Sequence, residues 1–517
     1  MTHWSFISRT HAMAEVLIAG AGPTGLTLAL WLTRQGVRVR LIDKSAGPGE
    51  TSRAMAVQAR TLELYRQVGI ADAVVAAGHR TPAMNLWARG KRRARIALQD
   101  SAAGISPYPF VLVYPQDQHE RLLIAQLQTL GVAVERTTEL LYFEDRGDRI
   151  TARLRLPDGS EQAAEVRYLA ACDGARSPAR HQLGIGFEGG TYKQVFYVAD
   201  VELGGLQSMD EAHVALGDGD FILVLAYSKR GHYRLIGTVR DARADRAESL
   251  TFADVSQDAI RNLGVRIDRV NWFSTYRVHH RVADAFRRGR VFLLGDAAHV
   301  HSPVGGQGMN TGVLDAINLS WKLADVLQSR ASDAVLDSYA TERQAFARTL
   351  VNTTDRAFTL VTAEGSVASF VRTYVAPTLA SLAYRLRNVS ELMFRTVSQT
   401  MLHYRDSPLS TGKAGDVAGG DRLPWVQTAD ADNYAALPQI GWQLHVYGNA
   451  QPALQAWCDA RDIALRVFAW RPEHHAAGFA QDAAYLVRPN GYVAFATADA
   501  SPAALDAYRV SHGYSQD

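Results

Sequence analysis

A glycine-rich turn near the start of the chain constrains the fold more than any other feature. The short apolar run Glu15–Ala19 is typical of a buried strand, and the turn Gly20–Gly25 follows it directly with the spacing GxGxxG. Next, Leu26–Gln35 has the pattern of a helix that Gly36 ends, and Val37–Ile42 is a second predicted strand. This order is typical of dinucleotide-binding units, so we expect a doubly wound parallel sheet.

Each position of the turn has a physical reason. Gly20 permits the tight turn, Gly22 lets a pyrophosphate approach the backbone, and Gly25 allows the helix to pack closely on the strand. The helix N-terminus presents free N–H groups to the phosphates. Asp43 ends the second strand, where an acid accepts hydrogen bonds from the adenosine ribose. The motif predicts dinucleotide binding, but it does not by itself choose between NAD and FAD.

Length and charge narrow the class of protein further. The chain has 517 residues, more than the ~250–300 at which one core stops growing, and roughly 150 residues per domain predicts about three domains. The net charge is only +3, which is not the electrostatic footprint of a dedicated nucleic-acid binder. We interpret the one basic run, Arg89–Arg95, as a solvated hairpin or loop.

The cysteines and the apolar runs bear on compartment and on metal binding. Cys172 and Cys458 lie far apart, so they form no disulfide framework, and no Cys/His cluster has zinc-like spacing. No apolar run reaches the ~18–20 residues that span a bilayer, and Met1–Ala14 lacks the features of a secretory signal. We therefore expect a cytoplasmic protein with no metal site, no membrane segment and no nucleic-acid partner.

Two further segments add to the glycine turn. An apolar strand leads into Cys172-Asp173-Gly174. Further on, the buried strand Val291–Leu294 leads into Gly295-Asp296, and the glycine-rich turn Gly305–Gly308 opens a long helix from about Met309. The chain thus carries a GxGxxG turn, a DG pair and a GD pair in that order.

These segments resemble the class A FAD-dependent aromatic hydroxylases, the superfamily of para-hydroxybenzoate hydroxylase and phenol hydroxylase. The most specific part is GDAAHxxxPxGGQGMN, which begins at Gly295. The resemblance implies a tightly bound FAD, an NADPH or NADH donor, and transfer of one oxygen atom from O2 to an aromatic substrate through a C4a-hydroperoxyflavin. It also implies a Rossmann-like FAD domain interleaved with a β-sheet substrate domain.

The resemblance assigns the FAD-binding positions residue by residue. They are Gly20, Gly22, Gly25, Asp43, Arg53, Gln116, Asp173, Asp296, Gly305, Gly306, Gly308, Met309 and Asn310. Arg53 matches an arginine near the phosphate and ribose, Gln116 a glutamine beside the ribityl chain, and Asp296 the acid that bonds the ribityl hydroxyls. The family usually has Glu where Asp43 stands, and we expect the shorter side chain to reach the ribose.

The resemblance also locates the oxygen chemistry. Pro303 and Gly308 belong to the loop along the isoalloxazine ring, where small residues leave room for the hydroperoxide. The positive end of the dipole of the helix that starts near Met309 would favour the anionic reduced flavin. We expect His299 to support the loop rather than react, and the family varies at His301.

A base in the substrate domain would help, because a phenolic substrate reacts best as its phenolate. The candidates are Tyr227, His232, Tyr233, His279 and His280. Of these, the catalytic hypothesis takes Tyr227 and His279. The runs Phe221–Tyr227 and His232–Thr238 predict a hairpin, whose alternation places Tyr227 on the face of Phe221. That face either lines the pocket or belongs to the core.

The domains are expected to interleave, in a fold of the α/β and α+β classes. The FAD-binding domain takes residues 14–80, 111–180 and 276–405; the substrate-binding domain takes 81–110 and 186–275; and the C-terminal domain takes 421–517. The last is similar to the thioredoxin-like domain of phenol and polyketide hydroxylases, which commonly have Asp where Asn490 stands. It lacks CxxC, which excludes thiol–disulfide exchange and favours a structural or dimer-related role.

The function predicted from these observations is NAD(P)H-dependent hydroxylation of a small phenolic or polyketide substrate. The same fold also allows epoxidation, Baeyer–Villiger oxidation or reduction, or a flavin-bound protein that sequesters a ligand without turnover. A halogenase is disfavoured because no WxWxIP-type segment follows the first strand–helix–strand unit. The sequence leaves open the substrate, the choice between NADPH and NADH, and whether the protein is a homodimer.

Overall fold

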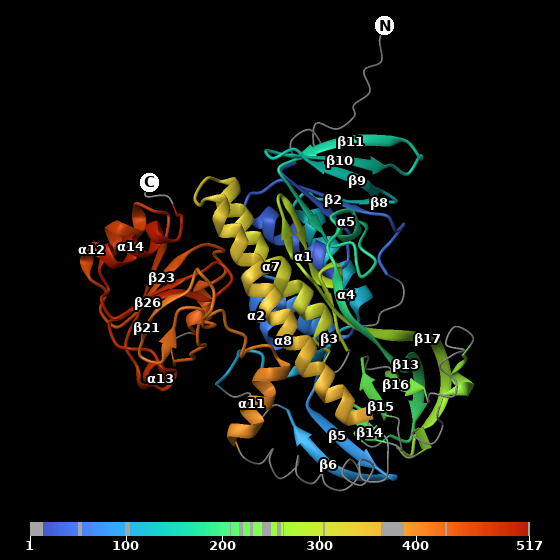
Figure 1. Cartoon of the computed structure of the whole chain (residues 1–517). Helices are drawn as coiled ribbons and strands as arrows, with labels where there is room; N and C mark the ends of the chain where they lie inside the picture. Colours follow the sequence, from blue (N-terminus) through green and yellow to red (C-terminus); the bar gives the residue numbers. More distant parts are fainter. Residues whose placement is uncertain are drawn as a thin grey trace.

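Figure 1 shows the fold of the chain in a computed structural model. The structure describes residues 14–49, 54–98, 104–206, 208–216, 221–227, 231–239, 250–255, 260–261, 263–302, 306–362, 387–429 and 432–514. Among the described helices, none has a stretch both long enough and apolar enough to span a lipid bilayer.

A six-stranded sheet carries the glycine turn, with its strands in the order β18-β19-β12-β1-β2-β8. The strands are β1 Val16–Ala19, β2 Val39–Asp43, β8 Val134–Arg136, β12 Tyr168–Ala171, β18 Arg287–Arg288 and β19 Val291–Leu293. Every pairing from β19 to β8 is parallel, and only β18 is antiparallel to its neighbour. The predicted α/β class is confirmed for this part of the chain.

Helices cover this sheet, and one of them begins directly after the second glycine-rich turn. They are α1 Pro23–Arg34, α4 Gln116–Thr129 and α7 Gly308–Leu327, and α1 packs against both of the others. The carboxyl ends of β1, β2, β12 and β19 meet at one edge of the sheet, because these strands run parallel. That edge therefore collects the GxGxxG turn, Asp43, the DG pair and the GD pair.

An eight-stranded sheet lies beside the first unit, with the order β20-β17-β13-β16-β15-β14-β5-β6. Its strands are β5 Ala83–Ala88, β6 Lys91–Ala97, β13 Phe187–Gly204, β14 Ala212–Leu216, β15 Phe221–Ala226, β16 His232–Val239, β17 Arg266–Ala283 and β20 His299–Val300. The predicted hairpin is formed by β15 and β16, which pair antiparallel. The edge strand β20 follows the GD pair at Gly295-Asp296. One edge of the large sheet therefore lies next to that pair.

Smaller elements complete this part of the fold. Two three-stranded sheets have the orders β11-β10-β9 and β3-β7-β4. Their strands are β3 Ala56–Val57, β4 His79–Thr81, β7 Val111–Val113, β9 Glu139–Asp145, β10 Ile150–Arg155 and β11 Glu161–Val166. The remaining helices are α2 Ala59–Gln67, α3 Ala71–Ala77, α5 Pro178–Gln182, α8 Asp337–Thr362 and α11 Arg387–Val397, with short 3-10 turns at η3 Phe252–Asp254, η4 Gly295–Ala297 and η5 Asp333–Leu336.

The C-terminal unit, orange to red in Figure 1, is built on a further sheet of order β22-β21-β26-β25-β23-β24. Its elements are β21 Thr411–Ala414, β22 Val417–Ala418, η7 Asn433–Ala436, β23 Gln443–Tyr447, α12 Pro452–Asp459, β24 Ala464–Phe468, α13 Pro472–Ala476, β25 Ala484–Val487, β26 Val493–Thr497 and α14 Pro502–Ser511. β23 is parallel to β24 and antiparallel to β25, and β25 is antiparallel to β26.

The apolar core runs without a break from the flavin-binding sheet into the C-terminal unit. One cluster of buried residues contains Val16 and Trp321 together with Leu444, Leu454 and Leu486. The indole rings of Trp321 and Trp442 meet edge to face, with 5.6 Å between centroids. The C-terminal unit therefore shares one core with the six-stranded sheet and its helices.

Candidate flavin and substrate site

The glycine turn is shaped by two close approaches and one open position. Gly20 has φ of +104°, and a Cβ there would lie 2.2 Å from the carbonyl oxygen of Cys172. A Cβ on Gly25 would lie 1.9 Å from the carbonyl oxygen of Gly20. In contrast, a Cβ on Gly22 would meet no described atom within 4 Å. Two glycines therefore let backbone segments touch, while the third faces space that a phosphate group can enter.

Asp43 is tied to this turn. Its Oδ2 accepts a hydrogen bond from the backbone N–H of Ala21 at 2.6 Å, and its Oδ1 accepts one from Ser45 N at 2.7 Å. Arg136, at the end of the neighbouring strand β8, lies 3.9 Å from Asp43 Oδ2. The Arg136 Nη2 atom is buried and has no hydrogen-bond partner among the described residues. The sequence analysis missed Arg136, because only the strand order brings it beside Asp43.

The DG pair lies at the base of the same turn. A Cβ on Gly20 would sit 3.1 Å from the backbone nitrogen of Asp173. Asp173 Oδ2 accepts a hydrogen bond from Ala179 N at 3.2 Å, while its Oδ1 is buried without a partner in the described part of the chain. Burial raises the pKa of this carboxyl group. Asp173 therefore caps the start of α5 and keeps one oxygen available at the turn.

The GD pair packs against the first turn of α1. A Cβ on Gly295 would lie 2.7 Å from Thr24 Oγ1, so the η4 turn rests directly on the first helix. Asp296 is exposed at the carboxyl end of β19. Gln116 is half-buried as the first residue of α4, and its Nε2 donates to Glu120 at 2.9 Å. The three acidic residues of the motifs, Asp43, Asp173 and Asp296, therefore share one edge of the sheet.

Helix α7 begins at Gly308, one residue before the predicted start. Among the described residues, a Cβ on Gly308 would meet only the ring of His301, at an ordinary 3.7 Å. Gly306 has φ of +62°, and a Cβ there would lie 2.7 Å from Ala56 Cβ. Met309 packs partly buried against the core. Three further predicted residues, Arg53, Pro303 and Gly305, lie outside the described residues.

Asn310 was expected to contact the cofactor, and its side chain is fully engaged with the protein instead. Its Oδ1 accepts hydrogen bonds from Gln58 N at 2.9 Å and Thr61 Oγ1 at 2.8 Å. Its Nδ2 donates to the carbonyl oxygens of Ala56 at 2.8 Å and Gly306 at 3.0 Å. These four bonds use the hydrogen-bonding capacity of the amide. Asn310 therefore ties the flavin loop to α2, which is a positioning role.

The two histidines of the loop differ in their surroundings. His299 is buried, and its Nε2 hydrogen bonds with Asp315 Oδ2 at 2.7 Å. His301 bonds through Nδ1 to the carbonyl oxygen of Ser302 at 2.8 Å, and its buried Nε2 has no partner in the part of the chain that the structure describes. Burial lowers the pKa of His301 to about 4, so the ring is neutral at pH 7. Its Nε2 is an acceptor beside Gly308.

The large sheet has one buried face and one half-buried face. Ile222, Val224 and Ala226 of β15 belong to the buried core, whereas Phe221 and Tyr227 on the opposite face are half-buried. Alternation along β15 thus places Tyr227 on the face opposite the one that Ile222, Val224 and Ala226 turn to the core. Burial raises the pKa of Tyr227 to about 12, so its hydroxyl is a proton donor at neutral pH.

Aromatic side chains gather on this half-buried face. The ring centroids of Phe196 and Tyr276 are 5.7 Å apart, and those of Phe196 and Phe221 are 6.0 Å apart. Val278 and Ile236 complete the group. Phe196 and Val278 are buried, and the half-buried rings of Phe221 and Tyr276 pack against them.

The structure separates the two predicted histidines of β17. His279 is exposed, and its Nδ1 hydrogen bonds with Thr191 Oγ1 at 2.7 Å. His280 is half-buried on the alternate face of the strand, 4.6 Å from the ring of Tyr192. Alternation places His280, and not His279, on the face of Val278 in the aromatic group. The sequence could not decide between neighbours in a strand whose faces were unknown.

Known proteins match this chain over most of its length. Residues 13–354 match the family model described as FAD binding domain. The 6-methylpretetramide 4-monooxygenase of Streptomyces rimosus is 40% identical over 410 residues, which are 78% of this chain and 72% of the relative. The pentachlorophenol 4-monooxygenase of Sphingobium chlorophenolicum is 32% identical over 425 residues, 81% of this chain and 77% of the relative. The chain belongs to the FAD-dependent aromatic monooxygenases.

A solved structure extends the likeness to the C-terminal unit. The ternary complex of aklavinone-11 hydroxylase with FAD and aklavinone has a TM-score of 0.77 to this monooxygenase at 26% identity. The match covers 96% of this chain and 99% of the other. The overall arrangement of the monooxygenase is therefore one that binds FAD and aklavinone in a related protein.

The residues of the monooxygenase fit FAD. Buried polar atoms on Arg136, Asp173 and His301 lack partners among the described residues, and native proteins rarely leave such atoms unsatisfied. Space opens at Gly22, in front of the N-terminus of α1. Donors, acceptors and space thus occur where the GxGxxG turn, the DG pair and the loop converge.

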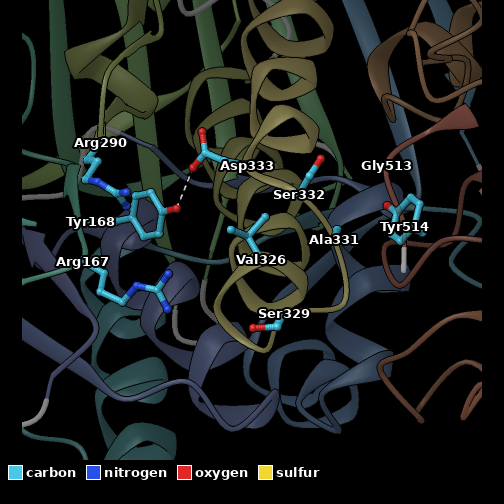
Figure 2. Close-up of a pocket in the computed structure, with 10 residues that line it drawn as sticks. All are labelled: Arg167, Tyr168, Arg290, Val326, Ser329, Ala331, Ser332, Asp333, Gly513 and Tyr514. Carbon is cyan, nitrogen blue, oxygen red and sulfur yellow. Dashed lines mark hydrogen bonds between the residues drawn. The ribbon is translucent and has the colours of Figure 1, made fainter. Parts of the chain in front are cut away.

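A groove of about 570 Å³ lies at the opposite edge of the flavin-binding sheet (Figure 2). Tyr168 opens strand β12, and its hydroxyl donates to Asp333 at 2.7 Å. The guanidinium of Arg290 lies over the Tyr168 ring, and Tyr514 of the C-terminal unit forms the far wall. Because parallel sheets bind nucleotides at the carboxyl ends of their strands, this groove is not the flavin site.

Proposed function

We propose that this monooxygenase uses NADPH or NADH and O2 to hydroxylate a phenolic ring of a small aromatic or polyketide substrate. The observation that carries the proposal is the convergence of the three flavin motifs on one sheet edge, next to the edge strand of a sheet with an aromatic half-buried face. FAD, once reduced by the nicotinamide nucleotide, supplies the activation of O2 and the transfer of one oxygen atom to the ring.

The protein's own residues bind and orient. In this proposal the N-terminus of α1 and Gly22 receive the pyrophosphate, and Asp43 receives the adenosine ribose. Asp296 and Gln116 bind the ribityl chain, and the start of α7 at Gly308 stabilises negative charge on the reduced ring. Backbone N–H groups and small residues do this work, so no acid–base side chain is required at the loop.

The substrate is proposed to lie on the face formed by Phe196, Phe221 and Tyr276. With the pKa of Tyr227 raised to about 12 by burial, its hydroxyl acts as a hydrogen-bond donor to a substrate oxygen rather than as a base. His280 replaces His279 as the candidate to accept a phenolic proton, because it shares the face of the aromatic group. Aromatic rings with the polar side chains of Tyr227 and His280 beside them favour a flat phenolic substrate.

The finer domain assignments are also proposals. We propose that the C-terminal unit is thioredoxin-like. The strand order β26-β25-β23-β24 supports this, with α12 between β23 and β24, α13 between β24 and β25, and α14 after β26. The assignment of residues 81–110 to the substrate-binding domain is supported by the entry of β5 and β6 into the sheet built from residues 187–283. Two proposed boundaries need to move: β17 runs past residue 275 to Ala283, and β21 and β22 join the C-terminal sheet before residue 421. A cytoplasmic location is supported by the free cysteines Cys172 and Cys458.

Product analysis with labelled oxygen tests the proposed reaction. The purified FAD-bound protein is supplied with NADPH or NADH, 18O2, and either a monocyclic phenol or a polycyclic phenol. We expect one phenol to stimulate nucleotide oxidation and to gain a hydroxyl group that carries one 18O atom. Detection of a ring-expanded ester or an epoxide would show that the protein catalyses another oxygen transfer instead of hydroxylation. A reduced product without 18O would exclude oxygen transfer. Nucleotide oxidation that depends on no ligand would overturn the proposal.

A further inference from the structure

The tip of the β25–β26 hairpin, residues Arg488–Tyr492, is inserted into the flavin-binding unit. We call this segment the hairpin tip. All five of its residues are buried, although it belongs to the C-terminal unit. Arg488 Nη1 donates to Glu342 on α8 at 2.7 Å, and Arg60 on α2 donates to the carbonyl oxygen of Asn490 at 2.7 Å. The flavin reaction described above gives this insertion no role.

One chain of contacts leads from the hairpin tip to the flavin loop through α2. The guanidinium of Arg60 lies over the ring of Tyr492, 4.7 Å from its centroid. Arg60 is completely buried, so its position is set by the groups it contacts. The neighbouring residues Gln58 and Thr61 are the two that donate to Asn310 Oδ1. A displacement of Arg60 would therefore move the groups that hold the first turn of α7.

A second chain leads from the hairpin tip to the GD pair through α8. The rings of Tyr492 and Tyr404 are 4.5 Å apart. The hydroxyl of Tyr404 accepts a hydrogen bond from Arg343 Nη1 at 3.0 Å, and Arg343 Nε donates to Asp315 Oδ1 at 2.7 Å. Asp315 Oδ2 in turn accepts the backbone N–H of Gly295 at 2.9 Å. Gly295 directly precedes the acid of the GD pair.

Both chains contain buried charges that are paired: Arg60 with Glu63 at 2.8 Å in the first chain, and Arg343 with Asp315 at 2.7 Å in the second. Asp315 and Arg343 are completely buried. Burial alone would raise the pKa of Asp315, but His299 and Arg343 hold it below its ordinary value. Moving one member would leave another charge unpaired in the interior, which is costly. Such a network therefore has one preferred geometry.

We infer that the hairpin tip is a positioning element for the flavin loop, acting through the ring of Tyr492 on Arg60 and Tyr404. Through them it sets the places of Asn310 and Gly295, on either side of the loop that receives FAD. The C-terminal unit, which lacks CxxC, thereby takes part in cofactor binding without touching the cofactor. The inference concerns FAD binding only and does not depend on which aromatic substrate is hydroxylated.

The matched pair Tyr492→Leu and Tyr492→Phe tests the role of the ring in the full-length protein. The Tyr492 hydroxyl is buried and has no hydrogen-bond partner among the described residues, so phenylalanine keeps the contacts of the ring with Tyr404 and Arg60. We expect Tyr492→Leu to weaken FAD binding by about tenfold, and Tyr492→Phe to restore it. FAD dissociation constants are measured by fluorescence titration of the apoprotein. Hydrogen exchange is expected to speed up in residues 295–299 and 306–312.

Tyr404→Phe tests the second chain without removing a ring. It deletes the acceptor of Arg343 and keeps the ring contact with Tyr492, so we expect faster exchange at residues 295–299 and FAD binding weakened severalfold. The control is Tyr485→Phe, because the Tyr485 hydroxyl bonds only within the C-terminal unit, to Ala414 and Ala480. This control should lower the melting temperature and leave the FAD dissociation constant within about twofold.

Three results would overturn the inference. The first is an unchanged FAD dissociation constant and unchanged exchange in both Tyr492→Leu and Tyr404→Phe. The second is a failure of Tyr492→Phe to restore binding. The third is an equal loss of FAD binding in Tyr485→Phe, which would make the effect one of general stability. If Tyr492→Leu does not fold, Tyr404→Phe and its control decide the question alone.

Discussion

The flavin-binding unit has two functionally different sides. At the carboxyl edge of its sheet, glycine leaves space at Gly22 and polar atoms of Arg136 and His301 lack partners among the described residues. Against the C-terminal unit, large charged side chains are completely buried and paired, as in Lys322 with Glu342. The first side uses small residues and unsatisfied groups, and the second uses large residues and satisfied ones.

The difference follows from what each side meets. A ligand that enters and leaves must find room and free hydrogen-bonding groups, so the protein keeps both at the sheet edge. A permanent contact inside one chain has no such need, and buried ion pairs are tolerated there because their geometry never has to change. The comparison predicts that substitutions on the two sides damage different properties.

The largest loss of stability is expected on the packed side. Glu342 accepts hydrogen bonds from Lys322 Nζ and Arg488 Nη1, each at 2.7 Å. Glu342→Gln would leave two buried cations without their counter-charge, and we expect the free energy of unfolding to fall by about 3–5 kcal/mol. Urea denaturation measures the change. The exposed pair Glu139–Arg155 supplies the control Glu139→Gln, and an equal loss in both variants would contradict the comparison.

Two glycines of one turn should separate stability from binding. A Cβ on Gly25 would clash with the Gly20 carbonyl at 1.9 Å, so Gly25→Ala is expected to destabilise the apoprotein by about 1–3 kcal/mol or more. Gly22→Ala meets no described atom and should leave the melting temperature of the apoprotein unchanged while weakening FAD binding. The comparison fails if Gly22→Ala destabilises the apoprotein as much as Gly25→Ala does.

Filling the space at the start of α7 should affect chemistry more than folding. Gly308→Val adds a side chain where, among the described residues, there is only an ordinary contact with His301, so the protein should fold and bind FAD. We expect product formed per nucleotide oxidised to fall on the order of tenfold, with the difference released as hydrogen peroxide. Gly441→Val, at an open position in the C-terminal unit, is the control. Normal coupling in Gly308→Val would show that the space is not used.

The smallest effect is a pH dependence from His119, which is buried between α1, α2 and α4. Burial lowers its pKa to about 4, below the roughly 6.5 of an unfolded histidine. Between these values the unfolded chain binds more protons, so the free energy of unfolding falls as the pH drops from about 6.5 to 4. His119→Gln should reduce the change of the free energy of unfolding with pH by the equivalent of up to about one bound proton. Identical slopes in the two proteins would contradict the burial of a neutral ring.

Local patterns in the sequence predicted the elements around the site well. The strand before Gly20, the helix after it and the acid at the end of the second strand occur where the pattern put them, and α7 starts one residue early. These features depend on contacts between residues close in sequence, such as Gly25 with Gly20 and Asp43 with Ala21 across two adjacent elements.

Side-chain orientation and distant partners could not be predicted in the same way. His279 and His280 are neighbours, and only the placement of β17 in the sheet decides which one is exposed. Asn310 matched a cofactor-binding position, yet its amide is used by residues about 250 positions away. Arg60 and Asn490 are 430 positions apart, and nothing in either local pattern indicates that they meet.

The sequence by itself determined the class of cofactor site, because a nucleotide-binding turn is made from backbone conformation and the absence of side chains, which adjacent residues specify. The tertiary structure alone decided which polar groups remain available there and which are consumed inside the protein. That choice depends on strand order, on the alternation of faces in the large sheet and on the insertion of the hairpin tip. Each of these is settled by burying apolar surface and pairing charges across segments that the sequence keeps far apart.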